Sequence, residues 1–235
     1  MSDDDIDEHR FQQAFAAVDP EPLLLLQILI EDPIETTVHD LAFYYTEAVE
    51  ENPSRGPYLA SVLVKVANSP DAPTFPSDTV SSCLNRALAD QHFKTFYGDS
   101  RVKEYGPKNT YLLESLLSGL SFKYDLTSTS DMLGTLCDGL DTPHGSSDSP
   151  EVSVIGTCIQ LLIHGSEVTE RAAGSSYHMS PEEIASKLKA HKAAGIVKDP
   201  HALQVLDLTI SLAETGFQPE NDREDVWDLL FPPKA

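Results

Sequence analysis

Apolar residues recur with the period of an α-helix along almost the whole chain. Between residues 38 and 49 they stand at i, i+3, i+4, i+7, i+10 and i+11, which puts them on one helical face. The set is Val38, Leu41, Ala42, Tyr45, Ala48 and Val49. No segment shows a convincing alternation of apolar and polar residues, which a half-buried β-strand would require. The pattern predicts an all-α fold.

The same spacing returns often enough to predict about ten helices, each of about 10–20 residues. One runs from Pro22 to Ile30 and is almost wholly apolar. The other main sets are Phe11, Phe15 and Val18; Leu59, Leu63 and Val66; Val80, Leu84, Ala87 and Leu88; Leu112, Leu113, Leu116, Leu117 and Leu120; Met132, Leu133, Leu136 and Leu140; and Leu203, Leu206, Ile210 and Ala213. Residues 154–162 are apolar on most sides, so we expect that helix to be central.

Start and stop signals support these helices. Ser180 and Glu183 fit the two halves of a capping box around a proline at the first helical position. Asp199 and Pro200 begin the next helix in a similar way. Gly216 suits the left-handed residue that follows a helix.

Helices with more than one apolar face, placed in series, cannot bury both faces within a single hairpin. A stack of helical hairpins buries both apolar faces, because each hairpin covers the next. We therefore predict a HEAT-type α-solenoid that forms one domain. A compact helical bundle is the alternative all-α architecture.

The net charge of the chain limits the kinds of molecule that it can bind. The 235 residues carry a formal net charge of −22, and Arg10 is the only strong base up to Glu51. A field of this sign repels phosphate, so we expect little direct binding of nucleic acid. Basic protein surfaces are the partners that such a field attracts.

Features of secreted and membrane proteins are missing from the sequence. The three cysteines, Cys83, Cys137 and Cys158, form no CxxC pair, and we expect them to be small core residues in a reduced compartment. The acidic start "MSDDDIDEHR" matches neither a secretory signal nor a transit peptide. The apolar run from Leu23 has eight residues, too few to span a bilayer. These observations predict a soluble intracellular protein that does not bind a membrane.

No motif for catalysis is found in the sequence. GxSxG, GxxxxGK[ST] and HExxH do not occur, and the eight histidines stand on separate predicted elements without ligand spacing. Catalytic sites can still assemble in space from distant residues. A helical stack without a cofactor motif is nevertheless most typical of a binding scaffold, so we predict no enzyme activity, no metal and no cofactor.

Four segments, in order, resemble a known family. The stretch "ALQVLDLTISLAETGFQP", residues 202–219, is similar to the last repeat of the middle domain of eukaryotic initiation factor four-G. "SSCLNRALADQHF", residues 81–93, resembles its Leu-Asn-Arg helix, although His92 stands where an acid is usual. "NTYLLESLLSGL" and "IGTCIQLLIHGSEVTE" resemble the following helix and the fourth-repeat helix. The nearest likeness is to the small stand-alone members, of the poly(A)-binding-protein-interacting and stem-loop-binding-protein-interacting types.

The resemblance implies a crescent of about five helical hairpins over residues 11–219, flanked by an acidic segment at 1–10 and an acidic aromatic tail at 220–235. It also implies an adaptor without catalysis, in translation initiation or mRNA fate. Such domains bind a DEAD-box RNA helicase, or join an mRNA-bound protein, such as a poly(A)-binding or stem-loop-binding protein, to the initiation machinery. Some stand-alone members are homodimers. The implied location is the cytoplasm, with the nucleus as a second compartment. The alternative function is that of a scaffold subunit in an unrelated complex.

Two basic stretches and the tail are the candidate contact regions. Arg86, Lys94, Arg101, Lys103 and Lys108 form the densest basic stretch, which is either a docking patch for an acidic segment or a set of ordinary solvated helix ends. The second stretch, residues 187–198, is interpreted as a solvated face.

The tail contains Trp227, Leu230 and Phe231 among acids. It either covers the last hairpin near Phe217 or docks on a partner, because so short a helix needs a groove to be stable. Phe217 and these three residues complete the candidate contact set.

Overall fold

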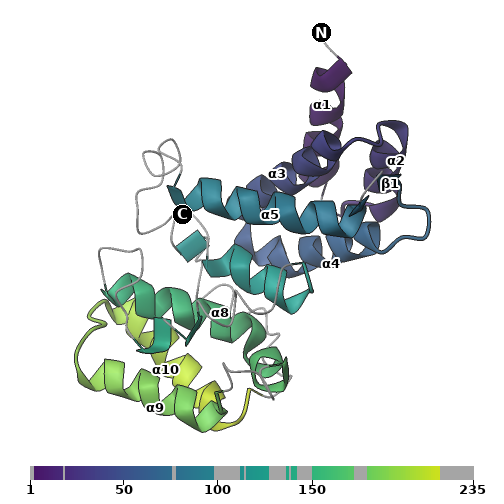
Figure 1. Ribbon diagram of the computed structural model, residues 1–235. Coiled ribbons are helices and arrows are strands. Elements are labelled where there is room, and N and C mark those ends of the chain that lie inside the picture. Colours follow the sequence, from purple (N-terminus) through teal and green to yellow (C-terminus); the bar gives the residue numbers. More distant parts are fainter. Residues whose placement is uncertain are drawn as a thin grey trace. The chain divides into compact units, whose positions relative to one another are not determined.

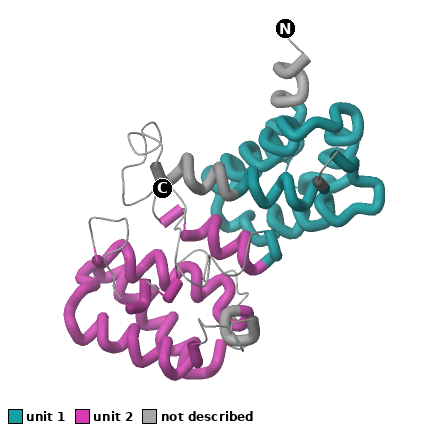
Figure 2. Tube along the Cα trace, in the orientation of Figure 1, with its two compact units in different colours: residues 1–94, 124–127 teal, residues 95–123, 128–235 magenta. Residues whose placement is uncertain are grey.

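The computed structural model is all-α in character (Figure 1), as the apolar periodicity predicts. It describes residues 3–17, 19–75, 78–97, 112–113, 115–126, 136–137, 139–141, 150–171 and 179–217. The chain forms two compact units (Figure 2). Unit 1 comprises residues 1–94 and 124–127, and unit 2 comprises residues 95–123 and 128–235.

Unit 1 is built from four α-helices, a short 3-10 helix, a small hairpin and most of a fifth helix. The elements are α1 (Asp3–Ala16), α2 (Pro22–Glu31), α3 (Glu35–Glu51), η1 (Pro53–Arg55), α4 (Gly56–Ala67), β1 (Thr74–Phe75), β2 (Asp78–Thr79) and α5 (Val80–Tyr97). Helix α1 begins at Asp3, so it includes the acidic residues that precede the predicted first helix. Helix α1 packs on α2 and α3, and α2 packs on α4.

The core of unit 1 consists of the predicted apolar faces. All six residues of the stripe on α3 are buried, as are Phe11 and Phe15 on α1. Arg55 joins two of these elements, since its guanidinium donates to the carbonyl oxygens of Phe15 (3.2 Å) and Ala17 (2.5 Å) at the end of α1. A cation there complements the negative end of the helix dipole.

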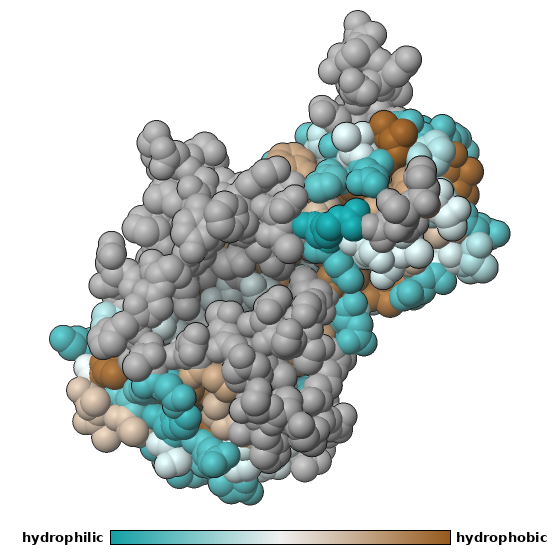
Figure 3. Space-filling model, in the orientation of Figure 1, coloured by the Kyte–Doolittle hydropathy of each residue, from teal (hydrophilic) through white to brown (hydrophobic). Residues whose placement is uncertain are grey.

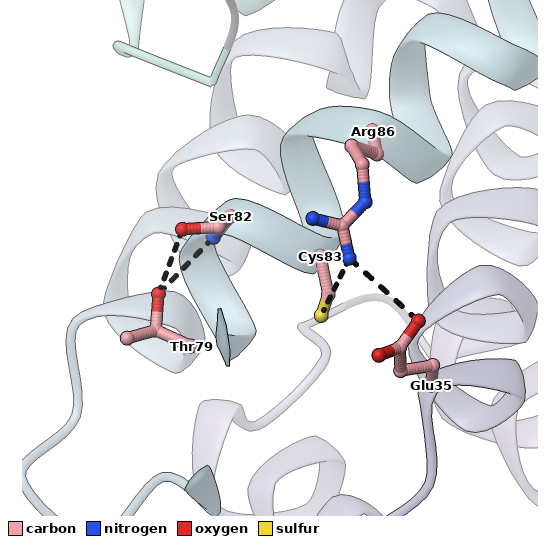
Figure 4. A network of polar contacts seen from close by, with 5 residues as sticks. All are labelled: Glu35, Thr79, Ser82, Cys83 and Arg86. Carbon is pink, nitrogen blue, oxygen red and sulfur yellow. Dashed lines mark hydrogen bonds and ion pairs between the residues drawn. The ribbon is translucent and has the colours of Figure 1, made fainter. Parts of the chain in front are cut away.

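The only strands among the described residues are β1 and β2, of two residues each. They pair antiparallel, with Thr74 opposite Thr79 and Phe75 opposite Asp78. Alternation cannot be recognised over two residues, which is why the sequence did not predict them. At the start of α5 the Thr79 hydroxyl accepts from the Ser82 amide (3.2 Å), as an N-cap does (Figure 4).

The described residues of unit 2 include three long helices and two shorter helical stretches. The long helices are α8 (Pro150–Arg171), α9 (Pro181–Ala193) and α10 (Pro200–Glu214). The helical stretches lie within 112–123 and 136–141. Helix α10 packs on both α8 and α9. Every described side chain from Val152 to Gly165 is buried, so α8 is the central helix of this unit, as its apolar pattern predicts.

Helix α8 kinks where it meets the end of α10. His164 has non-helical backbone angles (φ −136°, ψ 21°) and is buried, and its ring lies 4.6 Å from that of Phe122. At Gly165 a Cβ atom would stand only 2.4 Å from the ring of Phe217. The ring therefore occupies space that only a glycine leaves free.

Both predicted start signals in unit 2 are confirmed. The Ser180 hydroxyl accepts from the Glu183 amide and the Glu183 carboxylate accepts from the Ser180 amide, which completes the capping box. The Asp199 side chain accepts from the Ala202 amide at 2.9 Å. The predicted left-handed glycine is also present, since Gly216 has φ 78°.

Candidate interaction surface

Most of the predicted contact residues lie outside the described part of the chain. This holds for Arg101, Lys103, Lys108, Trp227, Leu230 and Phe231. Lys94 belongs to α5, but its side chain is not among those described. Arg86 and Phe217 can be placed.

Arg86 lies on α5 and reaches toward the start of α3 (Figure 4). Its guanidinium lies 3.6 Å from the Glu35 carboxylate and 3.4 Å from the sulfur of Cys83. The Arg86 and Glu35 side chains are 53% and 52% exposed, and an ion pair this open to water contributes little stability. Arg86 is thus accessible, but its charge is already partly compensated within unit 1.

Phe217 lies in the core of unit 2. The residue is 1% exposed, adopts φ 49° and packs on Gly165. A partner contact at Phe217 would require this ring to leave its position. The buried ring therefore serves the packing of α8 against the end of α10.

The second basic stretch is tied to acids that are distant in sequence. Lys187 pairs with Asp141, Lys189 with Glu214 and Lys192 with Asp207. These partners come from α10 and from the stretch before α8, rather than from one turn away on α9. These acids partly compensate the charge of three of the four lysines in this stretch.

The described surface also has an apolar region, on unit 1. Every large apolar side chain described as exposed lies in or beside α2. These residues are Leu23 (74%), Leu24 (43%), Ile30 (48%), Ile34 (46%) and Tyr58 (39%), and we call them the α2 face. Brown hydrophobic surface is visible on unit 1 in Figure 3, in the area where Figure 1 places α2.

The α2 face results from a helix that is apolar all round. Its opposite side, Leu25, Leu26, Ile28 and Leu29, is buried against α1, α3 and α4. Two neighbouring elements extend the face at its ends. Tyr58, in the first turn of α4, has its hydroxyl 3.5 Å from the Pro20 carbonyl, and Ile34 stands immediately before α3.

One carboxylate lies within the α2 face, and others stand close to it in the sequence. Gln27, between Leu23 and Ile30, donates to the Glu31 carboxylate at 2.7 Å, and Arg10 pairs with the same carboxylate at 2.7 Å. These two hydrogen bonds, from Gln27 first and then from Arg10, hold the pKa of Glu31 below its ordinary value, so it is charged at neutral pH. The other nearby acids along the chain are Asp19, Glu21, Asp32 and Glu35.

Sequence reasoning missed this face although the signal was available. In "PLLLLQILIE" only Gln27 and Glu31 are polar, so a helix over this stretch has more apolar positions than one neighbouring layer can cover. We predicted a helix here and interpreted the run as too short for a membrane, but did not consider which of its apolar sides would stay exposed. No helix in the described ranges is long and apolar enough to cross a bilayer.

Among the described residues, no group of three or more His, Cys, Asp or Glu side chains is placed to hold a metal ion. No protein-family model matches the chain, and comparison with curated proteins finds no significant match. The likeness to the middle domain of initiation factor four-G therefore rests on the four quoted segments.

Proposed function

We propose that the chain is a non-enzymatic adaptor that binds other proteins in translation initiation or mRNA fate. The observation that carries the binding role is the α2 face, where Leu23 is 74% exposed and Ile30 is 48% exposed beside acids. Fully burying a leucine or isoleucine contributes about 1.5–3 kcal/mol, so an exposed group of them favours a protein partner.

The resemblance to the middle domain of initiation factor four-G supplies the place of this adaptor in the cell. It implies a HEAT-type stack of about five hairpins over residues 11–219, and a DEAD-box helicase, a poly(A)-binding protein or a stem-loop-binding protein as partner. The pairing of α9 with α10 and the packing of α10 on α8 support stacked hairpins. A homodimer and a cytoplasmic location, with a second pool in the nucleus, belong to the same proposal.

The second candidate is a scaffold subunit of an unrelated complex. The α2 face favours it equally, because an exposed apolar helix binds by shape and charge and does not reveal the process in which its partner acts. The two candidates differ only in the partner.

Affinity purification of the full chain from cells, followed by mass spectrometry, tests the proposal. Nuclease treatment of the lysate serves as the control for RNA-mediated capture. We expect a DEAD-box helicase, a poly(A)-binding protein or a histone-mRNA factor to be retained after nuclease treatment. Reproducible recovery of another complex without any of these would favour the scaffold role, and recovery of no specific partner would overturn both.

A further inference from the structure

We propose that the α2 face is the docking site for a basic amphipathic helix of a partner protein. This inference rests on the proposed function, because it specifies the chemistry of a partner that an adaptor requires. Two observations support the inference: the exposure of the apolar side chains and the charge around them.

The spacing of the exposed residues suits a helical partner. Leu23 and Ile30 are seven residues apart, so they lie on the same side of α2, about 10.5 Å apart along its axis. Leu24 and Tyr58 are also exposed near the start of α2, and Ile34 is exposed three residues after its end. An amphipathic helix that presents anchors at i, i+3 or i+4, and i+7 covers the same length.

Charge selects the kind of helix. The first 51 residues contain fourteen acids and one strong base, Arg10. The Glu31 carboxylate lies within the face and is 47% exposed, and Arg10 partly compensates its charge, as Arg86 does that of Glu35. Lysine or arginine residues flanking the anchors of a partner helix would be attracted to the exposed acids Asp19 and Glu21 just before α2. Such attraction speeds association and selects against acidic competitors.

The same charge argues against the other occupants. A second copy would bring a net charge of −22 against the same acidic surface. The tail at residues 220–235 contains apolar residues but also Glu220, Asp222, Glu224, Asp225 and Asp228. Nucleic acids and anionic lipids carry phosphates, which this field repels. A basic protein helix is the occupant that gains from both the apolar side chains and the carboxylates.

Titration of the full chain with synthetic 18-residue peptides tests the proposal. The probe has Leu at i, i+3, i+4 and i+7 spacing and Lys elsewhere. A second peptide has Glu in place of every Lys, a third has the same Leu and Lys residues scrambled, and a fourth is the chain's own segment 218–235. We expect measurable one-to-one binding of the first peptide only, weakening between low and physiological ionic strength.

Variants locate the binding. Leu23→Ala with Ile30→Ala removes two exposed anchors while keeping strong helix formers in α2, and should weaken binding of the probe by about tenfold or more. Glu21→Gln removes one charge at the start of α2 and should weaken binding by about twofold to threefold at low salt. Asp71→Asn is the charge control. It removes one carboxylate from the turn after α4, which contributes no residue to the α2 face, and it should leave binding unchanged.

Several results would overturn the inference. If net charge alone attracted the probe, the double variant would bind it as tightly as the original chain does. The scrambled peptide would then also bind equally well. Stronger binding of the acidic peptide or of segment 218–235 would assign the face to another occupant. Self-association of the chain that is lost in the double variant would assign it to a second copy.

Two outcomes distinguish a failure of this inference from a failure of the proposed function. If affinity purification recovers the expected translation factors equally well with the double variant, the adaptor role stands and the α2 face is not its docking site. If the probe binds as expected but no translation factor is recovered, the docking chemistry stands and the role in translation fails.

Discussion

A methyl group added at Gly165 would enter the ring of Phe217. The three nearest ring atoms lie 2.4, 2.6 and 2.7 Å from the position of a Cβ atom, and Phe217 already has a left-handed backbone. We expect Gly165→Ala to lower the free energy of unfolding by about 1–3 kcal/mol, because the ring must move within a packed core. Urea denaturation measures this change.

Gly195 provides the matched glycine control. It has φ 65°, and no atom lies within 4 Å of its Cβ position. Gly195→Ala should cost about 1–2 kcal/mol through backbone strain alone, and Gly195→Asn should recover part of it, since asparagine tolerates this conformation. Equal stability of Gly165→Ala and the original chain would mean that Phe217 is not held against α8.

The buried thiol of Cys158 should make the free energy of unfolding fall at alkaline pH. Burial of the thiol raises its pKa from 9.0 to about 12, although a hydrogen bond with Thr209 acts in the opposite direction. Below pH 9 both the folded and the unfolded protein keep the proton. Above pH 9 the unfolded thiol loses its proton first, so stability falls as the pH rises toward 12.

Urea denaturation at pH 7, 9 and 10.5 should therefore show a falling free energy of unfolding, and Cys158→Ala should reduce the slope. Burial also raises the pKa of Tyr45, which adds a loss of the same sign at still higher pH. An identical slope in the Cys158→Ala variant would exclude this thiol as a source of the alkaline instability.

The capping box of α9 is the clearest prediction at the scale of an element. Ser180→Ala removes the side-chain acceptor of the Glu183 amide and should cost about 1 kcal/mol, whereas Ser180→Asp should keep most of the stability. Thermal unfolding followed by circular dichroism measures both. If Ser180→Asp loses as much as Ser180→Ala, the hydrogen bond to the backbone is not what stabilises this helix.

Helices and their caps were predictable because the signals are local. The stripe on α3, the caps of α9 and α10 and the left-handed Gly216 all depend on residues within a few positions of one another. The lysines of α9 show the limit of such reasoning. Their partners lie 15 to 46 residues away, and no periodic pattern reports a pairing between separate elements.

For the whole molecule, we predict that truncation after Pro219 leaves a folded helical protein. Helix α10 ends at Glu214, and Phe217 is buried against Gly165 before the tail begins. A cooperative thermal transition with the helical circular dichroism of the full chain is the expected result. Loss of that transition would make residues 220–235 part of the core, and the idea that Trp227 docks on a partner would fail.

Truncation after Glu214 is the matched comparison. It also removes Phe217, and deletion of a buried phenylalanine side chain costs about 3–5 kcal/mol. The shorter chain should therefore melt at a clearly lower temperature than the chain that ends at Pro219. Equal melting temperatures would show that the ring contributes little to unit 2.

The sequence by itself determined the helical class, most helix positions, two caps and the strongly negative charge, because these depend on composition and on contacts within one or two turns. Tertiary structure alone decided which side of α2 is buried, which acids neutralise the lysines of α9, and that Phe217 belongs to the core. A helix that is apolar all round offers several equivalent faces. The neighbours that cover one of them come from distant parts of the chain, so only the packed arrangement leaves Leu23 and Ile30 at the surface.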